Sequence, residues 1–344
     1  MSVEEGAGPT PDPSSSVRRP TLRDVAHEAG VSKGLASMIL SGTPGPSPVT
    51  TARVIEIADR LGYRKSKAAT MLAKRRNRLL GVTVLPSNEF HGELVEEIQA
   101  VADDLGYEIV LGAVSQSHDE RRAVETLVDF RCEALLLLGL TLPAAQMNEL
   151  TSGLTAVSIG RRVELATVDV VRADDGRAFN ELVDHLVTLG HHRIAHIDGG
   201  PGPIADLRRR SYRAAMRRHG LTATVLPGGL TESHGEAAID SLPLGDEHPT
   251  AVVCFNDRTA FGAIGRLERR GLSVPGDVSV TGYDDSIIAR HPRVDLTTVN
   301  QSTTEQARLA VQIAVERLDG VATGRREIVL DPLLIVRGST GPAR

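Results

Sequence analysis

The hydrophobic pattern near the start of the chain predicts three short helices, over residues 21–29, 33–40 and about 50–61. Thr21 can cap the first helix, because Asp24 lies three residues later, at the spacing of a capping box. Gly30 can end this helix, and Ser32 can cap the second. Two short helices joined by a turn that contains glycine are typical of a helix-turn-helix.

The second predicted helix has an apolar face and an open face. Ala36, Ile39 and Leu40 are expected to face the core. The open face then carries Lys33, Gly34, Ser37 and Met38. In a helix-turn-helix this is the face that meets base edges in the major groove of DNA. A helical hairpin without a DNA-binding role is the alternative interpretation.

From Leu79 onward the pattern changes to alternating strands and helices, over some 250 residues. Such alternation favours an α/β fold with parallel sheets covered on both faces, and this length suits two sheets better than one. The predicted helices cover residues 92–105 and 118–130, and the predicted strands cover residues 79–85, 108–114, 134–140, 156–159, 193–197, 251–255 and 278–283.

Charge divides the chain in the same place. The 344 residues have a net charge of −5, but residues 17–78 hold 13 Lys and Arg against 4 Asp and Glu, a net charge of +9. The rest of the chain has a net charge of −14. A basic N-terminal segment followed by an acidic remainder indicates that the N-terminal segment alone has a polyanionic partner. The alternative interpretation is that this segment is a solvated basic tail without such a partner.

Several classes of protein are disfavoured by what the sequence lacks. It holds no stretch of 18 apolar residues, so no membrane span is expected. The first residues include Glu4, Glu5 and Asp12 without an apolar segment, and they do not form a secretory signal. Cys132 and Cys254 lie in apolar runs, where reduced thiols are expected. We therefore predict a cytoplasmic protein.

No arrangement of catalytic or cofactor-binding residues stands out. The glycine-rich segment at residues 199–202 lacks the Lys and the Ser or Thr of a phosphate-binding loop. His191, His192 and His196 form a cluster, but no Cys or acidic residue completes a zinc-ligand spacing. We expect packing roles for these histidines, no metal, no cofactor and no enzymatic activity.

Several motifs, in order along residues 21–338, carry a family resemblance. They read TLRDVAHEAGVSKGLASMIL, ARVIEIADRLGYRKSKAATMLAKRRNRLLGV, VTLGHHRIAHI, AVVCFNDRTAFGAIGRLERRGLSVPGDVSVTGYDD and LTTVNQ. The chain resembles the LacI/GalR family of bacterial transcription regulators. The resemblance implies an N-terminal all-α helix-turn-helix domain and an α/β body like that of periplasmic binding proteins, with two parallel-sheet subdomains. The expected divisions are a disordered tail (1–20), a helix-turn-helix domain (21–65), a hinge (66–78) and an effector-binding and dimerisation domain (79–340).

The resemblance also implies a small-molecule cleft between the two subdomains. Family motifs place effector-binding residues at Arg208, Asn256, Asp284 and Gln301. Arginine, carboxylate and amide groups together can satisfy a polyhydroxylated ligand such as a sugar. Phe90 is a further candidate for stacking on a sugar face, with core packing as the alternative. Asp257 and Asp285 lie in the same motifs, and either could instead cap a helix.

The resemblance extends to the contacts with operator DNA. The family carries an arginine in the recognition helix where this chain has Met38, so base reading must depend on the remaining residues and on DNA shape. In the family the hinge becomes helical on DNA and inserts a leucine into the minor groove, which places Leu72 at the wedge. A flexible basic tether is the alternative for this segment. The implied DNA-binding residues are Thr21, Ser32, Lys33, Gly34, Ser37, Met38, Lys67, Ala69 and Leu72.

The predicted function is therefore that of a cytoplasmic transcriptional repressor whose affinity for double-stranded operator DNA is controlled by a small-molecule effector. A helix-turn-helix covers one half-site, so a homodimer is expected, with much of the interface on the first subdomain of the body. The sequence ends soon after the apolar residues 333–336 without a heptad helix, which favours a dimer over a tetramer. A sugar-binding transport protein and an α/β enzyme are the disfavoured alternatives.

Overall fold

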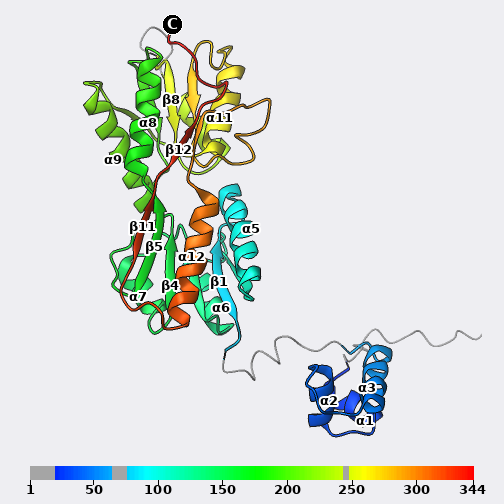
Figure 1. Cartoon of the computed structure of the whole chain (residues 1–344). Coiled ribbons are helices and arrows are strands. Elements are labelled where there is room, and N and C mark those ends of the chain that lie inside the picture. Colours follow the sequence, from blue (N-terminus) through cyan, green and yellow to red (C-terminus); the bar gives the residue numbers. More distant parts are fainter. Residues whose placement is uncertain (1–19, 64–75, 243–247) are drawn as a thin grey trace, which may run out of the picture. The chain divides into compact units, whose positions relative to one another are not determined.

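The computed structural model describes residues 20–63, 76–242 and 248–344 (Figure 1). They form two compact units, one ending at Arg76 and the other beginning at Asn77. We call these the helical unit and the α/β unit. The predicted tail and hinge lie outside the described residues, apart from Pro20 and residues 76–78.

The helical unit contains three helices, which are α1 (Leu22–Glu28), α2 (Lys33–Leu40) and α3 (Pro48–Arg60). The predicted capping box is present, because the Asp24 amide donates to Thr21 Oγ1 and the Thr21 amide donates to Asp24 Oδ2 at 2.7 Å. The Ser32 hydroxyl accepts from the Leu35 amide at 3.1 Å and caps α2. Gly30 adopts a φ of +62°, which suits a residue without a side chain at the turn between α1 and α2.

A small apolar core holds the three helices together. It contains two alanines of α1 and the turn, Ala26 and Ala29, together with Ala36 and Ile39 of α2. The small side chains allow the helices to approach closely, and Val54 and Ile57 of α3 cover the pair. The predicted apolar face of α2 thus lies in the core.

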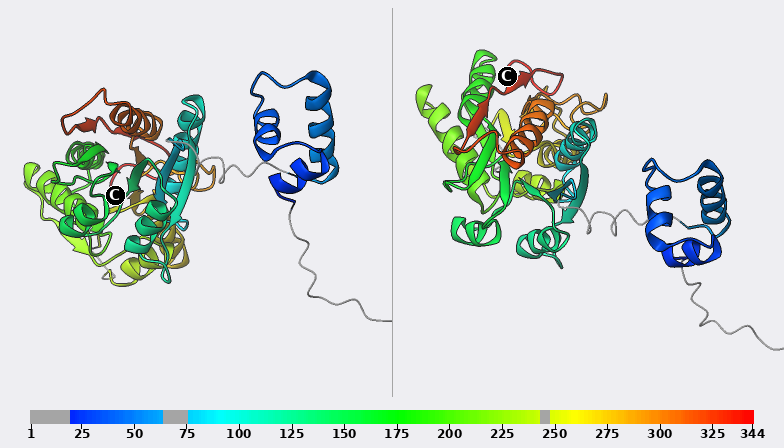
Figure 2. Two further views of the ribbon diagram at one scale, coloured as in Figure 1. Left: turned by 90° about the horizontal axis from the view of Figure 1, so that it is seen from below. Right: turned by 60° about the horizontal axis from the view of Figure 1, so that its bottom comes forward.

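The first subdomain of the α/β unit is built on a six-stranded parallel sheet with the strand order β11-β5-β4-β3-β1-β2. Helices α5 and α12 pack on one face of the sheet and α6 and α7 on the other (Figure 2). Coverage on both faces explains why β3 is a continuous buried apolar run. The elements are β1 (Leu79–Val84), α5 (Glu89–Asp104), β2 (Glu108–Ala113), α6 (Glu120–Asp129), β3 (Ala134–Leu138), α7 (Ala144–Leu150), β4 (Thr155–Ile159), β5 (Val168–Ala173), α12 (Thr303–Leu318) and β11 (Glu327–Leu330).

The second subdomain is built on a four-stranded parallel sheet with the order β7-β6-β8-β9. Helices α8 and α9 pack on one face, and α10 and α11 on the other. A separate antiparallel pair joins β10 to β12. The elements are α8 (Asp175–Thr188), β6 (Ile194–Ile197), α9 (Pro203–Arg218), β7 (Thr224–Leu226), α10 (Glu232–Asp240), β8 (Ala251–Cys254), α11 (Asp257–Arg269), β9 (Ser279–Thr281), β10 (Thr298–Asn300) and β12 (Leu333–Ile335).

The chain passes between the two subdomains three times. It crosses after β5, returns between β10 and α12, and crosses again between β11 and β12. The predicted fold class, two parallel-sheet subdomains behind a helix-turn-helix domain, is confirmed. In the part of the chain that the structure describes, no helix is both long and apolar enough to cross a membrane.

The strand β5 is missing from the predicted elements, because an acidic residue interrupts its apolar pattern. Asp169 is fully buried in this strand, and the Arg317 guanidinium of α12 donates to its Oδ1 at 2.7 Å. The partner lies 148 residues away, so the local pattern could not reveal it. The predicted start of α5 near Gly92 is also wrong: the helix begins three residues earlier at Glu89, where Asn88 caps it by accepting from the Phe90 amide at 3.1 Å.

Candidate functional site

The open face of α2 is the candidate nucleic-acid interface. Lys33 and Gly34 are exposed, the Met38 side chain is 43% exposed, and Ser37 is half-buried. A side chain at Gly34 would meet only the Ser32 hydroxyl, at 3.9 Å, so the backbone is open to an approaching ligand here. Helix α2 therefore presents a cation, a hydroxyl, an apolar side chain and bare backbone on one surface.

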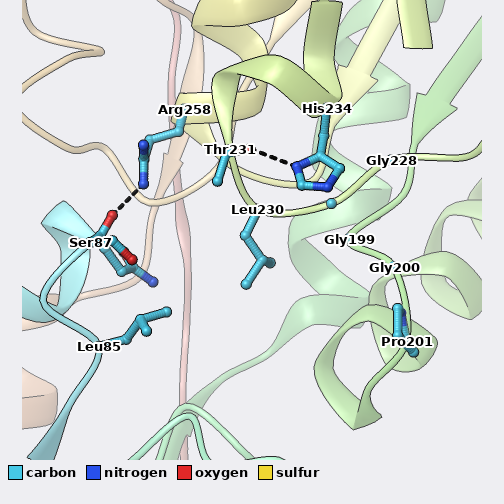
Figure 3. A pocket seen from close by; sticks show the side chains of 12 residues that line it. Leu85, Ser87, Gly199, Gly200, Pro201, Gly228, Leu230, Thr231, His234 and Arg258 are labelled. Atoms are coloured by element: carbon cyan, nitrogen blue, oxygen red, sulfur yellow. Dashed lines mark hydrogen bonds between the residues drawn. The ribbon is translucent and has the colours of Figure 1, made fainter. Parts of the chain in front are cut away.

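A cavity of about 430 Å³ lies between the two subdomains of the α/β unit (Figure 3). The segment that follows β1 lines it from the first subdomain, through Leu85, Ser87 and Asn88. Two glycine-containing loops and the starts of α10 and α11 line it from the second subdomain. These lining residues are Gly199, Gly200, Pro201, Gly228, Gly229, Leu230, Thr231, His234 and Arg258. The volume is in the range of small-molecule sites.

None of the five predicted effector residues lines this cavity. Arg208 of α9 is 5% exposed, and its Nε donates to Asp175 Oδ1 at 3.0 Å. Its Nη1 donates to the Phe255 carbonyl at 2.7 Å. The guanidinium carbon lies 3.6 Å from the centre of the Tyr283 ring and 4.7 Å from that of Phe255, so the cation is sandwiched between aromatic groups.

Asp284 and Gln301 belong to the same buried cluster as Arg208. Gln301 Nε2 donates to Asp284 Oδ1 at 2.7 Å, and this carboxylate lies 4.0 Å from Arg208 Nη2. Burial raises the pKa of Asp284 well above its ordinary value. The cluster is completed by Asp175, whose Oδ1 also accepts from the Tyr283 hydroxyl at 2.9 Å. Asp175 is a cluster residue that is not among the predicted ones, and its signal in the sequence is an acidic pair, Asp174 and Asp175, directly after the unpredicted strand β5.

Asn256 and Phe90 have structural partners of their own. Asn256 caps α11 by accepting from the Thr259 amide at 2.9 Å, and its amide donates to the carbonyl of Leu230 at 3.2 Å. Since Leu230 lines the cavity, Asn256 holds part of the cavity wall. Phe90 packs in the core of the first subdomain, among the residues of β1 and α5.

Asp257 and Asp285 do not cap helices, so that interpretation is wrong. Asn256 fills the cap position of α11, and Asp257 instead accepts from the Ser286 amide at 2.7 Å and the Thr298 hydroxyl at 2.6 Å. Burial raises the pKa of Asp257 to about 7. Asp285 pairs with Arg337 at 2.7 Å. These carboxylates tie the segment after β9 to β10 and to the C-terminal segment.

Arg258 and His234 are cavity residues that the sequence analysis did not identify. Arg258 makes a bidentate ion pair with Glu232, with donor–acceptor distances of 2.9 and 2.6 Å, and its third nitrogen donates to the carbonyl of Ser87. His234 Nδ1 lies 2.6 Å from the Thr231 hydroxyl. Arg258 follows the Asn256-Asp257 motif by one residue, which was the available signal.

The buried histidines have packing partners. The ring nitrogens of His191 bond to the hydroxyls of Thr250, at 2.9 Å, and Ser279, at 3.0 Å. His196 packs edge-on to Phe179, with ring centres 5.4 Å apart, and burial lowers its pKa to about 4. Both side chains therefore serve the hydrogen bonding and packing of the second subdomain.

Comparison with known proteins identifies the family. The model of bacterial regulatory proteins of the lacI family matches residues 21–66, and the model of the periplasmic binding protein-like domain matches residues 183–340. The HTH-type transcriptional regulator GalR of Escherichia coli (strain K12) is 30% identical over 326 residues, covering 93% of this chain and 95% of GalR. The chain belongs to the LacI family.

Solved structures of LacI-family proteins share the fold. A LacI transcriptional regulator from a Rhodococcus species is 44% identical, with a TM-score of 0.74, and its alignment covers 77% of this chain and 99% of that one. The transcriptional regulator CelR, solved as a complex with cellobiose, is 28% identical with a TM-score of 0.66. That alignment covers 93% of this chain and all of the CelR chain.

This LacI-family chain is a DNA-binding transcriptional regulator. The family predicted from the motifs is confirmed, and the match over residues 21–66 includes the helices α1, α2 and α3. The individual contact residues stay predictions.

Proposed function

We propose that the protein is a cytoplasmic repressor that binds a near-palindromic operator as a homodimer and responds to a small-molecule effector. The proposed response to an effector is supported by the cavity of about 430 Å³, which is lined from both subdomains. A ligand that contacts both subdomains binds with different affinity when the two subdomains are arranged differently. Such a difference in affinity is the requirement for allosteric control.

Operator recognition is assigned to the open face of α2. Lys33, Ser37 and Met38 present a cation, a hydroxyl and an apolar side chain, while Gly34 admits the DNA backbone or a base edge. Thr21 and Ser32 are exposed at the starts of α1 and α2, where they can reach phosphates. Lys67, Ala69 and Leu72 of the hinge lie outside the described residues, and their minor-groove role stays a prediction.

The effector is proposed to be a sugar or a related metabolite. The CelR complex with cellobiose supports this ligand class. Arg208 and Asn256 are proposed to act on the effector site, since each holds a segment next to the cavity: Arg208 bonds to Phe255, and Asn256 bonds to Leu230. Asp284, after β9, helps to hold Arg208 in place, and Gln301, at the crossing between β10 and α12, in turn holds Asp284. For Phe90, its place in the core supports the packing interpretation.

A thermal-shift screen of sugars and nucleosides, followed by operator titration, tests this function. A ligand at 100 times its dissociation constant adds about 2.7 kcal/mol to the free energy of unfolding. The same ligand is expected to change operator affinity. Leu230→Trp, which fills the cavity, is expected to abolish the stabilisation.

The matched control is Leu105→Trp. Leu105 is 42% exposed at the end of α5 and Leu230 is 40% exposed, but only Leu230 lines the cavity. The proposal is wrong if a stabilising ligand leaves operator affinity unchanged, or if Leu230→Trp responds to that ligand like the wild type.

A further inference from the structure

Arg258 bridges the two subdomains at the edge of the cavity (Figure 3). It belongs to the first turn of α11 in the second subdomain, where Glu232 of α10 holds two of its nitrogens at 2.9 and 2.6 Å. The remaining nitrogen donates to the carbonyl of Ser87, and Glu89 Oε2 lies 3.6 Å from Nε. Ser87 and Glu89 belong to the first subdomain, at the start of α5. A single guanidinium is therefore oriented from one subdomain and bonded to the other.

A second bridge also joins α5 of the first subdomain to the second subdomain. Glu93 of α5 accepts from the Ile287 amide at 2.8 Å and from Arg290 at 2.7 Å. Glu89 and Glu93 are four residues apart, so both bridges use the same face of α5. Arg258 lines the cavity and Glu93 does not, so a ligand in the cavity touches only the first bridge.

We propose that Arg258 is a positioning residue that holds the two subdomains together along α5, and that an effector in the cavity acts by displacing its contact with Ser87. This rests on the proposed function, because it names the contact through which the effector site is regulated. Helix α5 and β1 share one apolar core, to which α5 contributes Leu94 and Ile98 and β1 contributes Leu80 and Val82. Since β1 begins close to the boundary of the helical unit, a shift of α5 is transmitted to the strand that follows the DNA-binding part of the chain.

Hydrogen exchange of the full chain, without DNA or added ligand, tests the bridge. The reporter is the Ile287 amide, which bonds to Glu93 and so belongs to the second bridge. Arg258→Gln is expected to raise the exchange rate of the peptide that contains Ile287 about fivefold, the change expected for one lost hydrogen bond. The matched control is Arg266→Gln: Arg266 lies on the same helix and pairs with Asp240 of α10 at 2.6 Å, within one subdomain. This variant is expected to stay within twofold of the wild type.

Operator affinity gives the second readout. With operator DNA selected from random sequence by the wild-type protein, Arg258→Gln is expected to change the dissociation constant at least fivefold and Arg266→Gln is not. The claim that Arg258 holds the two subdomains together is contradicted if the exchange rate at Ile287 is unchanged in Arg258→Gln. It is also contradicted if the rate rises equally in both variants. Faster exchange with unchanged operator affinity overturns the regulatory role of Arg258. Failure of the wild type to select any operator contradicts the proposed function alone, because the exchange result is obtained without DNA.

Discussion

The open face of α2 and the cluster around Arg208 use their polar side chains in opposite ways. On α2, Lys33 and Met38 project to solvent, and the core of the helical unit is made by other residues of the same helix. In the cluster, the Arg208 guanidinium, the Asp284 carboxylate and the Gln301 amide each have a partner inside the protein. The exposed side chains of α2 can therefore contact a ligand, whereas the polar groups of the cluster are already bonded to other groups of the protein.

This difference separates two kinds of binding site. An exposed residue of α2, such as Lys33 or Met38, can be replaced without loss of folding, so its contribution to DNA binding can be measured alone. A residue of the cluster contributes to stability and to the shape of the cavity wall together, and a loss of effector response does not by itself identify a ligand contact.

The largest expected effect is on stability, from Arg208→Ala. Removing the guanidinium leaves the buried Asp175 carboxylate without its cation, and breaking a buried pair in this way costs about 3–5 kcal/mol. Urea unfolding of the variant measures this loss. Arg210→Ala, two residues along α9 at an exposed position, is the control and should stay within about 0.5 kcal/mol. Equal stabilities of the two variants would show that the cluster is not needed for folding.

The pH dependence of unfolding gives the next effect. The pKa of Asp257 is raised from 3.8 to about 7, so between these pH values the folded protein keeps a proton that the unfolded chain has lost. The stability contributed by this group therefore falls as the pH rises through that window, by up to about 1.4 kcal/mol per pH unit. The half-buried His91 and the buried His196 act in the opposite direction, because their pKa values are lowered from 6.5 to about 4.

Comparison of the wild type with Asp257→Asn isolates the Asp257 contribution. The difference between their free energies of unfolding, measured in urea from pH 4 to pH 8, should decline between pH 4 and pH 7 and then level off. A difference that is independent of pH would contradict the protonated state of Asp257 in the folded protein.

A smaller effect is expected from Lys33→Ala on α2. The free energy of unfolding should stay within about 0.5 kcal/mol of the wild type, because the side chain is exposed. If Lys33 contacts a phosphate, the slope of log affinity against log salt concentration falls by about 1. Operator titrations at several salt concentrations measure this slope. An unchanged slope would remove Lys33 from the phosphate contacts.

The sequence predicts the helical unit well because its signals are local. The Thr21–Asp24 capping box, the Ser32 cap and the apolar face of α2 all lie within a few residues of the structure that they specify. The start of α3 was placed two residues late, since Pro48 at the first helical position was assigned to the preceding turn.

The junction between the subdomains was predicted less completely because its signals are distant in sequence. Asp175 and Arg208 lie 33 residues apart, and Tyr283 bonds to Asp175 across 108 residues. The family resemblance singles out Arg208, Asp284 and Gln301, which the structure brings together in one buried cluster, but it could not show that none of them lines the cavity. Arg258 was missed because its partners Ser87 and Glu232 come from different subdomains.

Operator binding by a triple variant of α2 tests the central claim most directly. Lys33→Ala, Ser37→Ala and Met38→Ala are combined, and fluorescence anisotropy measures affinity for a selected operator and for random DNA. Specific binding by regulators is typically about 10³–10⁷ times tighter than their non-specific binding. The account predicts that the variant loses most of this preference while its thermal unfolding matches that of the wild type. A folded variant that keeps the wild-type preference would contradict the assignment of operator recognition to α2.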